Sequence, residues 1–172
     1  EEIAGQFPAA KVERLDFDTA RTRTAYERII SDFEKGKTQI LIGTQMLSKG
    51  LDFGNVSVVG ILSADSLMNF PDFRAHERAY QLMVQVSGRA GRRDKRGTVI
   101  LQTTQPEHPL IRMVQHFAYK EMVSLQLSER SMFRYPPYYR LIVLILRSRN
   151  EEALQEMSAL YAEKLRARLG ER

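Results

Sequence analysis

Apolar residues along the chain alternate between short β-rich runs and longer stretches with helical spacing. The short runs predict four strands, at residues 11–16, 39–44, 56–62 and 97–104. Helical spacing predicts helices over about 19–35 and 72–87, after the end of another helix at residues 1–7. This alternation is typical of an α/β domain, in which helices flank a parallel sheet.

The second half of the chain predicts a long helix followed by a change of domain. Residues 106–130 carry an apolar stripe at helical spacing, whereas Pro136 and Pro137 cannot continue a helix. We therefore predict two domains, 1–134 and 135–172. In the second, residues 140–148 predict a strand and Asn150 predicts the N-cap of a helix. One strand and one helix bury little core, so we expect an incomplete α+β domain.

Composition narrows the class of protein without identifying it. Hydrophobic residues make up 43% and charged residues 27% of the chain, an ordinary globular mixture. The lack of cysteine excludes disulfides and cysteine-ligated metal in this stretch, and the histidines have no partners at metal-ligand spacing. No apolar run could span a membrane and no signal-peptide pattern is present, which favours the cytoplasm. The sequence opens "EEIAGQFP" without an initiator methionine, so we expect a piece of a longer protein.

The net charge of +5 is concentrated in one place. Five cations fall within eight residues, opposed only by Asp94: Arg89, Arg92, Arg93, Lys95 and Arg96. Such a cluster suits a polyanion, although a run of charge is also what a solvated surface carries. Charge alone leaves both readings open.

Ligands of open parallel α/β sheets bind at the carboxyl ends of the strands, in the loops before the following helices. Two loops of this chain are candidates for such a binding site. The first is "GTQMLSKGLDF", residues 43–53. Thr44 offers a hydroxyl to a phosphate, Lys49 is a cation, and Asp52 could accept hydrogen bonds from a ribose. Gly50 would let the backbone approach a ligand closely. The alternative is a helix-capping loop whose charged side chains are solvated.

The second loop is "QVSGRAGRR", residues 85–93. Arginine presents a planar fork of donors that stays charged, which suits bidentate phosphate contact. Gln85 lies one helical turn before Arg89, and Arg92 follows nearly one turn later. Gly88 and Gly91 are costly inside a helix, so they indicate a helix end that approaches a ligand or a facing domain. The alternative is a basic turn.

Taken together, the two loops resemble motifs V ("TQMLSKGLD") and VI ("QVSGRAGR") of superfamily 2 helicases, in the second RecA-like lobe of these P-loop NTPases. The segments "ADSLMNFPDFRAHER" and "TVILQTTQPEHPLI" are similar to one subfamily, the bacterial primosomal replication-restart helicases. The resemblance covers residues 1 to about 150, with the "PP" junction leading into a small C-terminal domain.

The resemblance implies an ATP site with Mg²⁺ between two lobes. Arg92 would be the arginine finger, with Arg89 beside it and Gln85 sensing the γ-phosphate. Asp52 would contact the ribose, an approach that Gly50 permits. Gly88 would also line the nucleotide.

The same resemblance implies contacts with DNA. Thr44 would touch the backbone of single-stranded DNA, and Lys49, where many relatives carry arginine, would link the DNA and nucleotide sites. Arg74 and Arg78 lie in one segment with Phe70 and Phe73. The aromatic rings could stack on bases, and the cations could reach phosphates. The alternative is that Phe73 packs in the core and the arginines are solvated.

Several expected parts of such a motor are missing from the sequence. It has no phosphate-binding "GxxxxGK[ST]" loop and no acidic DExx motif on a strand, so we expect no ATP hydrolysis by this chain alone. The subfamily's zinc module is also absent, so zinc is expected only in the full-length protein. Expected partners are single-stranded and forked DNA, single-strand-binding protein and other primosome proteins, on the bacterial nucleoid. Two rival functions remain: another superfamily 2 repair translocase, or a non-catalytic nucleic-acid-binding module.

Overall fold

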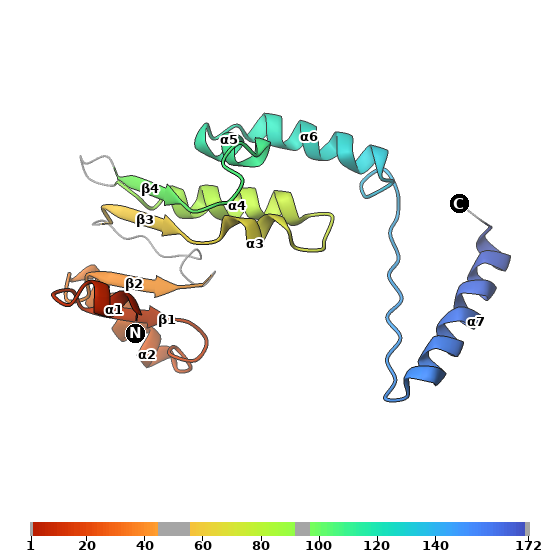
Figure 1. The fold of residues 1–172 in the computed structure, drawn as a ribbon, viewed down its shortest axis with the longest axis horizontal. Helices are drawn as coiled ribbons and strands as arrows, with labels where there is room; N and C mark the ends of the chain where they lie inside the picture. Colours follow the sequence, from red (N-terminus) through yellow and green to blue (C-terminus); the bar gives the residue numbers. More distant parts are fainter. Residues whose placement is uncertain (1, 45–55, 92–96, 171–172) are drawn as a thin grey trace. The chain divides into compact units, whose positions relative to one another are not determined.

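The computed structural model describes residues 2–44, 56–91 and 97–170. The chain divides into two compact units, Glu1–Phe133 and Arg134–Arg172. In the first unit, parallel strands are joined by helical crossovers, and its arrows point the same way in Figure 1. This unit has the α/β architecture that the sequence predicts.

The first strand pair consists of β1 (Val12–Leu15) and β2 (Ile40–Gly43), which run parallel. A parallel pair needs a crossover, and α2 (Arg23–Glu34) supplies it, after a short α1 (Glu2–Gln6) at the start of the chain. The hydroxyl of Thr22 caps α2 by accepting a hydrogen bond from the backbone N–H of Ala25. The apolar stripe of α2 buries Ile29 and Ile30 against Leu15.

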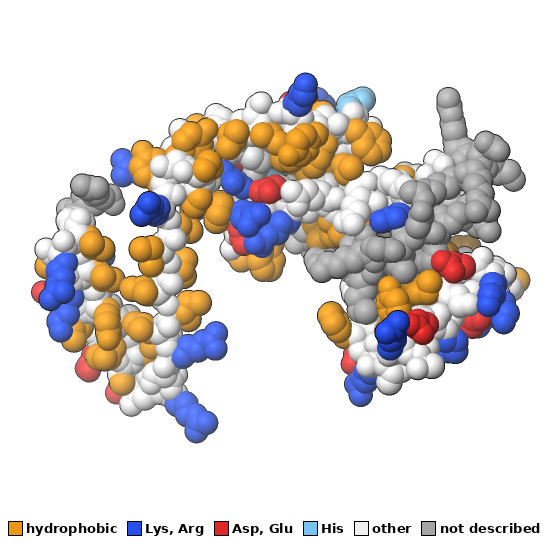
Figure 2. All heavy atoms as spheres, turned by 180° about the vertical axis from the view of Figure 1, so that it is seen from behind, with side chains coloured by type: hydrophobic (Ala, Val, Ile, Leu, Met, Phe, Trp, Pro, Cys, Tyr) orange, Lys and Arg blue, Asp and Glu red, His pale blue; other side chains and the backbone are white. Residues whose placement is uncertain are grey.

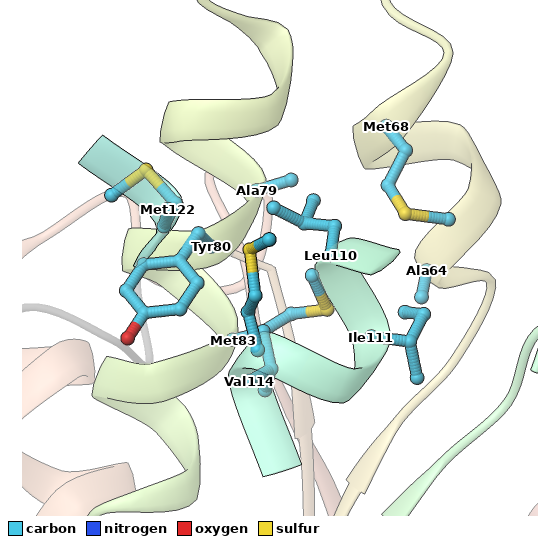
Figure 3. Packing of buried hydrophobic residues seen from close by; sticks show 10 residues of the cluster. Ala64, Met68, Ala79, Tyr80, Met83, Leu110, Ile111, Val114 and Met122 are labelled. Carbon is cyan, nitrogen blue, oxygen red and sulfur yellow. The ribbon is translucent and has the colours of Figure 1, made fainter. Parts of the chain in front are cut away.

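The second strand pair consists of β3 (Val58–Ile61) and β4 (Thr98–Leu101), also parallel. Between them come α3 (Ala64–Met68) and α4 (Ala75–Ser87), and after them α5 (Pro109–Gln115) and α6 (Tyr119–Met132). These helices bury one core, in which Met83 of α4 lies beside Leu110 and Val114 of α5 (Figure 3). Methionine fills irregular gaps well, and this core holds four: Met68, Met83, Met113 and Met122.

The helices cover one face of the second strand pair. Ile61 and Leu101 pack into the helical core, whereas Val58 and Ile100 on the opposite face are each 58% exposed. Alternate residues of a strand point to opposite faces, so this division follows directly from the pleat.

The four strands of this unit are confirmed, but three expectations about its elements are wrong. The strands form two separate pairs, because no hydrogen bonds join β2 to β3 in the part of the chain that is described. Residues 63–73, between the third predicted strand and the next predicted helix, were expected to form a loop but contain α3. The long helix expected over 106–130 is interrupted at His116–Ala118, where Phe117 has a φ of +52°. That break lets α6 return and bury Met122 in the core that α5 also enters.

The second unit contains α7 (Glu151–Leu169), which begins where predicted: the side chain of Asn150 accepts a hydrogen bond from the N–H of Ala153. The strand expected at 140–148 is not formed, because a strand requires a partner and these residues pair with nothing that the structure describes. Hydrophobic side chains are exposed along this segment and along α7 (Figure 2). Among the described helices, none is long and apolar enough to cross a membrane.

His108 gives the first unit a pH-dependent helix cap. Its Nδ1 accepts a hydrogen bond from the N–H of Leu110 at 3.2 Å, and its ring meets His76 edge-on at 5.4 Å. Burial, and then the nearby His76, lower the pKa of His108, against the opposing carboxylates of Glu129 and Asp65. Protonation would place a hydrogen on the atom that caps α5.

We predict that unfolding free energy falls as the pH drops below the ordinary imidazole pKa of about 6.5, because the unfolded chain then takes up the proton first. His108→Asn keeps a capping side chain that does not titrate. Urea unfolding at pH 7.5 and pH 5.5 should therefore show a smaller loss in this variant than in the parent. Equal losses would show that His108 does not contribute to the pH dependence.

Candidate functional site

Helix α4 carries the sequence-predicted residues on one exposed face. Its buried stripe packs into the helical core, and every third or fourth residue of the opposite face is exposed. The residues of the buried stripe are Ala75, Ala79, Tyr80 and Met83. The residues of the exposed face are Arg74, Arg78, Gln81, Gln85 and Gly88. This helical spacing places the candidates Arg74, Gln85 and Gly88 on the same side of α4, together with Arg78 and Gln81.

The carboxyl end of α4 brings together three of the candidate nucleotide residues. The helix ends at Gly88, as its sequence predicted, and the N–H of Gly88 donates to the carbonyl of Val84 at 2.9 Å. The N–H of Arg89 donates to the carbonyl of Val86 at 3.0 Å, so one further tight turn follows. Gln85 is exposed in the last helical turn, and Arg89 is half-buried just beyond it.

The turn after α4 contacts the residues that precede β3 and β4. Gly91 adopts a φ of +80°, a left-handed conformation that favours glycine, and its N–H donates to the carbonyl of Val56 at 3.1 Å. Val56 precedes β3. Gly97 precedes β4, and its Cα faces the backbone of the same turn. The turn that carries Arg89 therefore lies at the amino ends of β3 and β4. The expectation that both loops lie at carboxyl ends is wrong for this one.

The candidate DNA residues that are described lie at the other end of the strands. Thr44 is exposed and follows β2 directly, at its carboxyl end. Arg74 occupies the N-cap position of α4, after β3 and α3. Because α4 has 13 residues at about 1.5 Å each, its two ends are about 20 Å apart. The structure thus separates Arg74 from Gln85, Gly88 and Arg89.

Four candidates lie outside the described residues. Lys49, Gly50 and Asp52 fall in the segment 45–55, which connects β2 to Val56, and Arg92 falls in 92–96. The described residues next to the first segment are Thr44 and Val56. Those next to the second segment are Gly91 and Gly97.

The arginines at the amino end of α4 are held by neighbouring carboxylates. Arg78 pairs with Asp72 at 2.8 Å, and Arg74 lies 3.7 Å from Glu77. Asp72 also accepts a hydrogen bond from the N–H of Arg74 at 2.8 Å. That bond, together with the positive charge of Arg78, lowers the pKa of Asp72. Both arginine side chains remain about half exposed, so an anion in solution can still reach them.

Sequence reasoning missed a network that supports this end of α4. Arg130 of α6 forms an ion pair with Glu77, and its guanidinium lies 5.2 Å from the centre of the Phe73 ring. Phe73 is half-buried, whereas its neighbour Phe70 is 60% exposed. Arg130 and Glu77 are 53 residues apart in the sequence, and no local pattern connects them.

The described residues offer no metal site of their own: no group of three or more His, Cys, Asp or Glu side chains among them could hold an ion. The zinc expected from the resemblance has no cysteine ligands in this sequence. What the described site offers instead is cationic and amide donors on α4, which suit phosphate oxygens.

Comparison with known protein families shows which class of protein this chain belongs to. The family "Helicase conserved C-terminal domain" matches residues 4–94, more than half of the chain, in a range that includes both loops and all of α4. The chain belongs to this family of helicase C-terminal domains, and its parallel α/β unit is a RecA-like lobe.

Individual proteins that this chain resembles in sequence include several named "Replication restart protein PriA". The chain is 45% identical to the one from Bacillus subtilis and 42% identical to the one from Synechocystis sp., over 96% and 91% of its own length. It spans only 20% and 19%, about a fifth, of those two relatives. Among solved structures, the C-terminal domain of the DEAD-box protein Dbp5 matches 67% of this chain and 62% of that one, with 22% identity and a TM-score of 0.49.

The Arg130 network should stabilise the first unit measurably. Arg130 and Glu77 have side-chain exposures of 16% and 21%, so removing the cation leaves a poorly solvated carboxylate. We expect Arg130→Ala to lower the unfolding free energy by about 2 kcal/mol, the range of hydrogen bonds to charged groups. The matched control is Arg112→Ala, whose pair with Glu107 is 62% and 79% exposed and should contribute under about 1 kcal/mol. Urea unfolding of both variants tests this, and equal losses would contradict the structural reading.

Proposed function

We propose that the chain is the second motor lobe of an ATP-dependent DNA helicase that restarts stalled replication forks and loads the primosome. The observation that carries the proposal is the family match over residues 4–94, a range that includes the end of α4 with Gln85 and the turn with Arg89. The name of the PriA relatives supports replication restart in particular.

In this proposal the lobe supplies cations to an ATP site shared with a first lobe. Arg92 is the arginine finger, Arg89 lies beside it, and Gln85 senses the γ-phosphate. Charge spreads over the phosphoryl oxygens in the transition state, and a fixed guanidinium stabilises it there more than in the ground state. Bound ATP with Mg²⁺ supplies the transferable phosphoryl group. By the resemblance to superfamily 2 motors, the Mg²⁺ ligands would come from the first lobe.

The remaining candidates divide between two ligands. Gly50, Asp52 and Gly88 line the nucleotide, with Asp52 on the ribose. Thr44, Lys49 and Arg74 contact DNA. The separation of Arg74 and Arg89 along α4 supports this division, because DNA and nucleotide need distinct places on a motor lobe.

The partners and location follow from the same proposal. The longer protein binds single-stranded and forked DNA and works with single-strand-binding protein and other primosome proteins. It acts on the nucleoid in the bacterial cytoplasm and carries its zinc outside this chain. A repair translocase of the same superfamily would have the same ATP site but different partners.

The chain by itself should not hydrolyse ATP. It has no Walker-type "GxxxxGK[ST]" loop to hold the phosphates. The purified 172-residue chain, incubated with ATP, Mg²⁺ and single-stranded DNA, should release phosphate at the rate of a no-protein blank. Turnover that depends on DNA would overturn the half-site proposal.

In the longer protein that contains this chain, Arg92→Ala should reduce kcat for ATP by about three orders of magnitude or more, as loss of an arginine finger does. The matched control is Arg93→Ala, which removes an adjacent cation without a proposed role. DNA-stimulated phosphate release and thermal melting of both variants make the measurement. Near-normal turnover in a folded Arg92→Ala protein would remove Arg92 from this role.

A further inference from the structure

The backbone around Gly91 and Gly97 forms a tight contact, which we call the glycine clasp: Val56, Ala90, Gly91 and Gly97. Its first element is the hydrogen bond from the N–H of Gly91 to the carbonyl of Val56 at 3.1 Å. Its second is the close approach of Gly97 to Ala90 and Gly91. Next to it, the N–H of Thr98 donates to the carbonyl of Ser57 at 2.9 Å, so the clasp is continuous with the β3–β4 ladder.

The clasp has no room for a side chain at Gly97. A Cβ atom there would lie 2.5 Å from the carbonyl carbon of Ala90 and 2.6 Å from its Cβ, and closer still to the backbone nitrogen of Gly91. Two of these three atoms belong to the backbone, so a rotamer change cannot relieve the overlap. Any larger residue at position 97 must displace the turn itself.

Gly91 contributes in a second way. Its φ of +80° lies in the left-handed region, which a residue with a Cβ adopts only under strain. In this conformation the N–H of Gly91 donates to the carbonyl of Val56. Val56 packs against the core formed by Leu15, Ile29 and Ile30, whereas α4 packs into the other core through Met83. The clasp therefore fixes the end of α4 against both cores.

We propose that Gly97 and Gly91 are positioning residues of the ATP site: their backbone contacts hold the turn after α4 so that Arg89 is presented to the nucleotide. This inference rests on the proposed function. Arg89 is two residues before Gly91, in the turn that the clasp closes. A displacement of about 1 Å at a catalytic group can reduce turnover about 100-fold. A tightly packed turn that prevents such a displacement of Arg89 would therefore sustain ATP turnover.

The experiment uses the longer protein and compares strained glycine substitutions inside and outside the clasp. Gly97→Ala and Gly91→Ala disturb the clasp. Gly36→Ala is the control for left-handed strain, because Gly36 has a φ of +71° and nothing within 4 Å of its added Cβ. Gly60→Ala is the control for a methyl group in a strand, again with nothing within 4 Å.

We expect both clasp variants to lower kcat for ATP by 10- to 100-fold, on the order that such misplacement causes, with KM for ATP changed less than about twofold. Gly36→Ala should lower the melting temperature as much as Gly91→Ala while keeping kcat. A purely structural role predicts that all variants lose melting temperature alone. If Gly97→Ala is unfolded at the assay temperature, Gly91→Ala decides, because it keeps the N–H and adds one methyl group.

Arg89→Ala separates failure of the inference from failure of the proposed function. If Arg89→Ala loses turnover and the folded clasp variants keep it, the clasp does not position Arg89 and the inference is wrong. If the parent protein shows no DNA-stimulated ATPase, or Arg89→Ala retains full turnover, the proposed role of this turn in an ATP site is wrong instead.

Discussion

The burial of one face of α4 determines most of what this chain can do. The buried face of α4 consists of two alanines, one tyrosine and one methionine. It packs against α3, α5 and β3, and the core closes around Met83. Because the buried face is fixed, the opposite face is fixed as well. Arg74, Gln85 and Gly88 are exposed for that reason, and the loops at the two ends of α4 inherit their positions from the same packing.

The sequence pattern was informative where one element defines its own boundaries. Asn150 marked a helix start through its capping side chain, and Gly88 marked a helix end. These signals are local, and the structure agrees with them. The strands of the first unit were also predictable, because short apolar runs between helices leave few alternatives.

Tertiary contacts decided the rest. The left-handed Phe117 splits a stretch with continuous helical spacing, and only the docking of α6 onto α4 and α5 explains the break. The segment 140–148 has the composition of a strand, but pairing depends on a neighbour that local sequence cannot reveal. In the candidate site, the proximity of Gln85 to Arg89 was predictable from helical spacing. The bond from Gly91 to Val56 and the support from Arg130 were not, because each joins positions more than thirty residues apart.

Helix α4 also has a mechanical property. Its 13 residues form one uninterrupted helix, and an α-helix of that length is stiff along its axis. At one end stands Arg74, held to Glu77 and through Glu77 to Arg130; at the other, Arg89 follows a turn pinned by backbone contacts. A force applied at either end is carried as an axial displacement rather than absorbed by bending. The helix therefore sets a fixed spacing of about 20 Å between the residues at its two ends.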